Sequence, residues 1–118
     1  MENIAPQIQR QRLLIEGFYS RIIEKQDIEG YFRTICQQLS LRAYGEPIVF
    51  SPGGEGKEEN QGFDAFLPLI DSGISVYIWS NLKFFSIILF TCRNFDEFKA
   101  LNETKKYFKS SKTVSMRF

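Results

Sequence analysis

The alternation of hydrophobic and polar residues divides this chain into segments of strand and helix length. Apolar runs rich in β-branched and aromatic residues predict strands at residues 13–19, 46–50, 63–70, 71–79 and 84–92. Apolar residues at helical spacing predict one helix at residues 27–39, capped by Asp27, and a second from an N-cap at Asn94 to about residue 109. Residues 112–118 alternate again and predict a last strand at a sheet edge.

The order of these segments indicates the fold class. Strand, helix, three or four strands, helix and strand predict an α+β two-layer sandwich, in which both helices cover one face of an antiparallel sheet. A chain of 118 residues suits one domain. We expect a mobile N-terminal arm at residues 1–11 and a single domain at residues 12–118. The glycine-rich, charged residues 51–62 predict a solvated loop of the kind that often closes over a site.

The predicted strands at residues 71–79 and 84–92 form a hairpin that carries the candidate chemistry. Both are rich in Ile, Val, Tyr, Phe and Trp, and residues 80–83 form the turn between them. An acidic residue and a serine, Asp71 and Ser72, stand at the entrance to this hairpin. Cys92 stands at its exit.

Composition excludes several classes of function. The balance of 15 basic and 14 acidic residues gives a net charge of +1, which predicts no nucleic-acid partner. No apolar run approaches the roughly twenty residues of a membrane-spanning helix. Residues 1–12 lack the apolar core of a secretory signal, so we expect a cytoplasmic location. Cys36 and Cys92 show no CxxC spacing, which predicts neither a disulfide framework nor a metal site.

The order and spacing of residues in the hairpin resemble those of the small prokaryotic S-adenosylmethionine decarboxylases. In that family an acid–serine pair opens a strand ending in Trp, and a second strand ends in Phe-Thr-Cys. The matching positions here are Asp71-Ser72, Trp79 and residues 90–92. The stretches LLIEGFY at residues 13–19 and NFDEFKAL at residues 94–101 resemble the family's first strand and second helix. The likeness therefore covers residues 12–118.

The resemblance implies a role for each matching residue. Ser72 would be the source of a pyruvoyl cofactor formed by self-cleavage, and Cys92 would donate a proton to the product carbon. Asp71 matches a residue that contacts the substrate ribose, and Glu16 matches a glutamate near the active site. The family also implies S-adenosylmethionine as the ligand, a place in polyamine (spermidine) synthesis, and a homodimer that buries the uncovered face of the sheet.

One departure from the family pattern changes the expected function. The family has a histidine five residues after the serine that helps to form the pyruvoyl group, and this chain has Tyr77 there and no histidine anywhere. A phenol with a pKa of about 10 is only on the order of 0.1% ionised at neutral pH, and a lost base typically costs roughly 10² to 10⁴ in rate. Gly73 also replaces a second histidine that usually follows the serine. We therefore expect a ligand-binding relative without self-processing or cofactor, which could pair with an active paralogue.

Two other functions remain open at this stage. The first is a lyase that acts on S-adenosylmethionine without a pyruvoyl group, with help from Tyr77, Asp71 or Glu16. The second is a working decarboxylase in which another group replaces the histidine.

The single residues also have plain structural interpretations. Ser72 and Gly73 are a common way to turn into a strand, and Cys92 could be a small buried residue. Glu16 could face water from an open sheet. Tyr77 and Trp79 could be core beneath the helices, a subunit contact, or a stacking surface for adenine.

Overall fold

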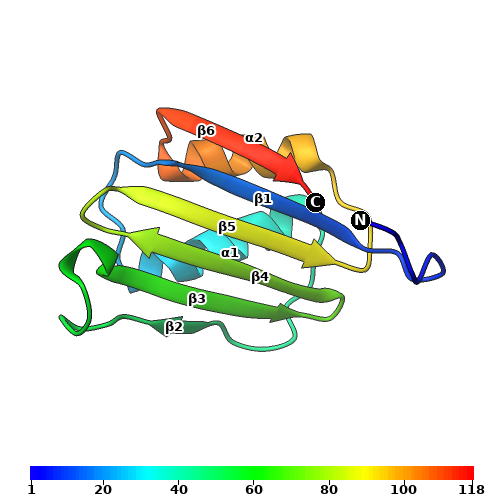
Figure 1. The fold of residues 1–118 in the computed structure, drawn as a ribbon, viewed down its shortest axis with the longest axis horizontal. Coiled ribbons are helices and arrows are strands. Elements are labelled where there is room, and N and C mark those ends of the chain that lie inside the picture. Colours follow the sequence, from blue (N-terminus) through cyan, green and yellow to red (C-terminus); the bar gives the residue numbers. More distant parts are fainter.

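The computed structural model describes residues 1–118 and shows one antiparallel sheet with both helices behind it (Figure 1). The six strands lie in the order β2-β3-β4-β5-β1-β6. The elements along the chain are β1 (Gln11–Phe18), α1 (Lys25–Leu39), β2 (Ile48–Phe50), the 3₁₀ turn η1 (Glu58–Asn60), β3 (Gly62–Leu69), β4 (Ser72–Trp79), β5 (Phe84–Thr91), α2 (Glu97–Phe108) and β6 (Lys112–Arg117). The predicted α+β two-layer sandwich is confirmed.

Alternation along the strands separates a buried face from an open one. In β4, Ile74, Val76 and Ile78 are buried beneath the helices, and the residues between them point to the other side. A cluster of 22 buried hydrophobic residues fills the space between sheet and helices. This single core agrees with a chain of one-domain size.

We call the side of the sheet away from the helices the open face. Figure 1 views it directly, with no helix in front of it. Large hydrophobic side chains remain exposed on this face, up to 67% in the case of Phe50. The others, placed on it by the strand registers, are Phe18, Ile48, Phe66, Phe90, Val114 and Met116. Several exposed hydrophobic side chains on one face of a sheet are typical of an interaction site.

The two helices are held together by a buried polar contact and by aromatic packing. The hydroxyls of Tyr31 in α1 and Thr104 in α2 lie 2.8 Å apart, and both residues are fully buried. The ring of Phe108 stacks on that of Phe85 in β5 at a centroid distance of 4.7 Å. The helix pair is thereby fixed against the middle of the sheet.

The N-caps lie two or three residues from the predicted ones, although Asp27 does cap the first turn of α1 as part of a capping box. The N-cap of α1 is Glu24, and Asp27 lies one turn later, where its carboxylate accepts the backbone N–H of Glu24 at 2.8 Å. The N-cap of α2 is Asp96 rather than Asn94, because the Asp96 side chain accepts the N–H of Lys99 at 3.0 Å. Acidic and amide side chains are common near helix starts, so composition alone did not identify the capping residue.

Strand boundaries also differ slightly from the prediction. β1 begins at Gln11, within the expected arm, and residues 1–10 contain only turns and bends. The mobility of that arm stays a prediction. β2 covers only Ile48–Phe50, since the preceding Pro47 has no N–H to donate to a ladder. β2 and β6 form the two edges of the sheet.

Candidate functional site

Ser72 and Cys92 meet at one end of the central hairpin. Ser72 is the first residue of β4 and pairs with Thr91, the last residue of β5. One residue further out, the N–H of Cys92 donates to the carbonyl oxygen of Asp71 at 2.8 Å. The Ser72 hydroxyl oxygen then lies 3.4 Å from the Cys92 sulfur. The hairpin register alone therefore brings together two residues that are twenty positions apart.

The backbone of Ser72 is strained at the start of its strand. Its φ of 135° lies in a region that residues with a side chain rarely adopt. Such a conformation typically costs on the order of 1–3 kcal/mol and persists only where the surroundings impose it. The strained residue is therefore Ser72 itself. Its peptide bond to Asp71 is the bond that the family resemblance would mark for cleavage.

The ring of Phe66 packs against Gly73 and occupies the space that a side chain at position 73 would need. A Cβ atom at position 73 would lie 2.5 Å from the Cζ atom of Phe66 in β3. Position 73 therefore cannot take a larger residue unless Phe66 moves away. The absence of a histidine after Ser72 thus goes together with a packing arrangement that fills the position.

Asp71 has one charged neighbour. Its carboxylate lies 3.9 Å from a guanidinium nitrogen of Arg93, and both side chains are partly exposed to solvent. Exposed pairs of this kind contribute little to stability. The carboxylate therefore remains accessible to a ligand beside Ser72.

Glu16 and Tyr77 lie in a different part of the sheet. Both residues flank Ser86 of β5 on the open face, Tyr77 from β4 and Glu16 from β1. The Ser86 hydroxyl donates to the Glu16 carboxylate at 2.7 Å. Tyr77 is five residues from Ser72 along an extended strand, a separation of about 16 Å. Within one chain, the structure does not bring Glu16 or Tyr77 to Ser72.

Tyr77 and Trp79 are not core residues beneath the helices. Both are half-buried on the open face, so that interpretation is wrong, and the subunit contact and the stacking surface remain. Trp79 packs against Phe84 at a centroid distance of 5.4 Å, and its ring nitrogen donates to Asn60 at 3.3 Å.

The glycine-rich loop lies at the far end of the sheet from Ser72. Its last residue, Gly62, pairs with Trp79 at one end of β4, while Leu69 pairs with Ser72 at the other. The side chain of Gln61 holds the loop by accepting from Gly54 at 2.9 Å. The expectation that this loop closes over the site does not hold within one chain.

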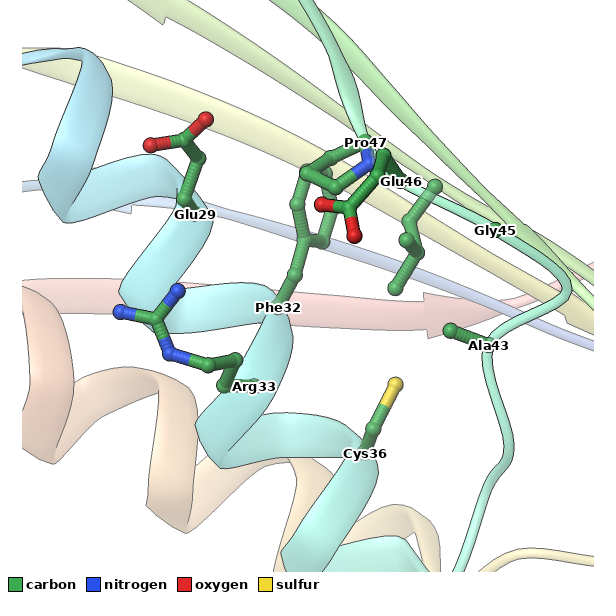
Figure 2. A pocket seen from close by; sticks show the side chains of 9 residues that line it. Glu29, Phe32, Arg33, Cys36, Ala43, Gly45, Glu46 and Pro47 are labelled. Atoms are coloured by element: carbon green, nitrogen blue, oxygen red, sulfur yellow. The ribbon is translucent and has the colours of Figure 1, made fainter.

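A separate hollow of about 450 Å³ lies on the helix side of the sheet (Figure 2). Glu29, Arg33 and Cys36 of α1 face the segment at residues 43–47 across it. Burial raises the pKa of the Cys36 thiol to about 11, so this cysteine stays protonated near neutral pH. Neither Ser72 nor Cys92 lines this hollow.

Two further observations concern metal ions and membranes. No group of three or more Cys, Asp or Glu side chains comes together in a way that could hold a metal ion. Neither helix has the length and hydropathy needed to cross a bilayer.

The sequence analysis missed two features of this region. The first is the hydrogen bond from Ser86 to Glu16, which involves a polar residue in an otherwise apolar strand. The sequence shows only a single serine there, and the strand pairing was needed to place it opposite Glu16. A cluster of arginines, Arg10, Arg12 and Arg117, lines a hollow beside β1. These residues come from both ends of the chain, so no local sequence motif could have predicted the cluster.

Comparison with known proteins identifies the class to which this fold and hairpin belong. Residues 14–118 match the model of the S-adenosylmethionine decarboxylase family. Because the match spans most of the chain, the chain belongs to that family. The crystal structure of the adenosylmethionine decarboxylase from Aquifex aeolicus VF5 has a similar fold, with a TM-score of 0.75. The two share 13% sequence identity over 94% of this chain and 89% of the other. No curated protein sequence matches this chain.

Proposed function

We propose that this chain binds S-adenosylmethionine, or a related nucleoside, at the Ser72–Cys92 end of the hairpin and does not convert Ser72 to a pyruvoyl group. The observation that carries the proposal is the position of Tyr77. It occupies the sequence position of the family's processing histidine, and a phenol is a far weaker proton acceptor than an imidazole near neutral pH. The chain contains no histidine that could replace it.

The residues at Ser72 fit the first part of pyruvoyl formation. The Ser72 hydroxyl is adjacent to the Asp71 carbonyl, and the N–H donated by Cys92 at 2.8 Å would stabilise negative charge on that carbonyl oxygen. In the family, the pyruvoyl ketone withdraws electrons from the carboxylate bond that breaks. The Cys92 thiol lies 3.4 Å from the Ser72 hydroxyl, so it could donate a proton to a product carbon held at Ser72.

The residues at Ser72 do not fit the second part, which removes the proton from the serine Cα. The side chain in contact with Ser72 is the Cys92 thiol, and Asp71 is its neighbour in the chain. An ordinary thiol, with a pKa of about 8.5, is mostly protonated near neutral pH and cannot then accept a proton. A carboxylate is a weaker base than an imidazole by more than two pKa units. The missing base therefore supports a chain that stays whole.

A second copy of the chain completes the proposed site. The open face carries several exposed hydrophobic side chains, and Asp71 and the half-buried Ser72 lie at the end of β4. In a homodimer that covers this face, Glu16 and Tyr77 of each copy would lie at the interface, and a ligand beside Asp71 would lie at its edge. A pairing with an active paralogue of the spermidine pathway would use the same surface.

Intact-mass spectrometry tests the absence of processing. We expect one species at the full mass of 13.8 kDa. Two fragments, residues 1–71 and 72–118, would show that the chain self-cleaves and would overturn the proposal.

Calorimetric titration with S-adenosylmethionine tests the binding. We expect saturable heat that falls in Asp71→Ala and is unchanged in Arg42→Ala, a solvent-exposed position with no side-chain partner. No heat at millimolar ligand would exclude binding at this site.

A second candidate function is lyase chemistry without the pyruvoyl group. It is favoured by the contact between the Ser72 hydroxyl and the Cys92 thiol, which places a group able to donate a proton beside Ser72. Chromatography of the titration mixture distinguishes the two: a binder leaves S-adenosylmethionine unchanged, and a lyase consumes it with the chain still whole. Release of carbon dioxide together with chain cleavage would instead identify a working decarboxylase.

A further inference from the structure

Arg93 places a guanidinium group at the end of the hairpin where Ser72 and Cys92 meet. It follows Cys92 directly, and one of its guanidinium nitrogens lies 3.9 Å from the Asp71 carboxylate. The backbone of Asp71 is fixed because its carbonyl accepts the N–H of Cys92. The backbone of Arg93 is fixed because its carbonyl accepts the hydroxyl of the buried Thr91. One positive and one negative group therefore stand side by side on rigid strand ends.

Both charged groups are free to bind a ligand. The distance of 3.9 Å between them is too long for a hydrogen bond, and neither side chain makes a hydrogen bond elsewhere in the chain. The five N–H donors of the Arg93 guanidinium and the carboxylate oxygens of Asp71 are therefore all open to outside partners. The two side chains are 48% and 32% exposed, so a ligand beside Ser72 can reach them.

A balanced pair of opposite charges matches a particular kind of chemical group. An α-amino acid carries an ammonium and a carboxylate on the same carbon, so its two charges also lie side by side. A guanidinium binds a carboxylate through paired N–H donors, and a carboxylate accepts from an ammonium. Asp71 and Arg93 together can thus satisfy both charges of an amino-acid group, which a single charged residue cannot do.

This inference rests on the function proposed above. If Ser72 stays unconverted, the amine of the ligand forms no covalent bond, keeps its positive charge and gains from a carboxylate such as Asp71. The carboxylate of the ligand is then also retained, and Arg93 can hold it. An arginine paired with that carboxylate stabilises the bound ligand in the form that decarboxylation would remove, so Arg93 suits binding better than decarboxylation.

We propose that Arg93 and Asp71 bind the amino-acid end of the ligand, Arg93 holding its carboxylate and Asp71 its ammonium group. Arg93 then determines specificity, because it favours ligands that keep the α-carboxylate over amines that lack it. The family resemblance gives Asp71 a different partner, the ribose of the substrate. The two assignments for Asp71 predict different results with a ligand that has the ribose and no amino-acid end.

Calorimetric titration with three ligands tests the role of Arg93. S-adenosylmethionine has the complete amino-acid end, its decarboxylated form lacks only the carboxylate, and methylthioadenosine lacks both charged groups. We expect the wild type to bind S-adenosylmethionine about tenfold more tightly than the decarboxylated form. Arg93→Gln should bind these two ligands equally, at the wild-type affinity for the decarboxylated form. Lys105→Gln, which removes an exposed charge on α2, should keep the wild-type preference.

A second variant tests the role of Asp71. Asp71→Asn should weaken binding of both ligands that carry an ammonium group and leave binding of methylthioadenosine unchanged. Circular dichroism checks that each variant is folded, and Arg93→Ala replaces Arg93→Gln if the latter is not.

Other results would overturn the proposal. Equal binding of S-adenosylmethionine and its decarboxylated form by the wild type would show that the carboxylate is not recognised, and the function proposed above would still stand. Equal weakening of both ligands in Arg93→Gln would show that Arg93 does not distinguish them. Weaker methylthioadenosine binding in Asp71→Asn would assign Asp71 to the ribose. No binding of any of the three ligands would overturn the proposed function itself, and this inference with it.

Discussion

Replacing Tyr77 with histidine is the most direct test of why this chain should remain whole. Tyr77 is half-buried on the open face, between Asp64 of β3 and Ser86 of β5, and makes no hydrogen bond through its hydroxyl. A histidine is smaller than a tyrosine and should fit there without disturbing the sheet. We expect Tyr77→His to cleave itself between Asp71 and Ser72, whereas the wild type does not.

The expected gain follows from the fraction of side chains in the basic form. At pH 7.5 an imidazole with an ordinary pKa near 6.5 is roughly nine-tenths unprotonated, and a phenol with a pKa near 10 is only about 0.3% ionised. A well-placed general base typically adds roughly 10² to 10⁴ in rate. The Cys92 N–H that would stabilise the attacked carbonyl of Asp71 already donates to it at 2.8 Å, and Ser72, which would attack, is the next residue.

Distance adds a condition to this prediction. Position 77 lies about 16 Å from Ser72 in the same chain, too far for direct proton transfer, so the histidine must act on Ser72 of a second copy. A mixture of the Ser72→Ala/Tyr77→His double variant with the wild type should therefore yield cleaved wild-type chains, although neither protein cleaves alone. The assay is intact-mass spectrometry over several days, with Tyr77→Phe as the inactive control.

Two results would refute this reasoning. Wild-type chains that cleave as fast as Tyr77→His would show that the identity of residue 77 does not limit processing. Cleavage of Tyr77→His alone, at a rate independent of protein concentration and without cleavage in the mixture, would show that the histidine reaches Ser72 within its own chain.

Three further predictions concern the core and the thiols. Tyr31→Phe and Thr104→Val should each cost about 1–3 kcal/mol in urea unfolding, because each leaves a buried hydroxyl unpaired, and the double variant should cost less than the sum. Burial raises the pKa of Tyr31, so its contribution to stability is present below about pH 10 and lost above it; the unfolding free energy should fall more steeply there in the wild type than in Tyr31→Phe. Titration of thiols with an aromatic disulfide at pH 8 should show Cys92 reacting quickly and Cys36 slowly, since burial raises the pKa of Cys36 to about 11 and Cys92 is exposed.

The type and order of the elements were predictable because hydrophobic periodicity reports which residues share a face. From Ile74 to Trp79, β4 alternates between buried and half-buried positions, and both helices carry an apolar stripe. The strand order was not predicted, since periodicity does not report which strands are neighbours. The insertion of β1 between β5 and β6 depends on pairing between residues up to 104 positions apart, such as Leu13 with Arg117.

The candidate site was predictable to the extent that it depends on one hairpin. Ser72 and Cys92 come together because β4 and β5 are adjacent and their register follows from a short turn. Glu16 was a candidate only because of the family resemblance. Its position two strands away from Tyr77, with Ser86 between them, could not be predicted without the strand order of the sheet. The arginine cluster needed the sheet order as well, because β6 returns along β1 only in the folded chain.

The proposal that this chain stays whole rests on two positions, 73 and 77, which have different structural surroundings. At position 73, Phe66 occupies the space in which a side chain would lie, so a histidine could return only if that ring moved. At position 77, nothing prevents a histidine, and the tyrosine there makes no hydrogen bond that the fold requires. A chain under selection for cleavage would have kept the base at position 77, where it costs nothing in packing. The hydrogen bond from Cys92 to Asp71 and the contact between Ser72 and Cys92 persist without that base, which is the arrangement expected of a binding site that uses the same strand end for a ligand rather than for its own peptide bond.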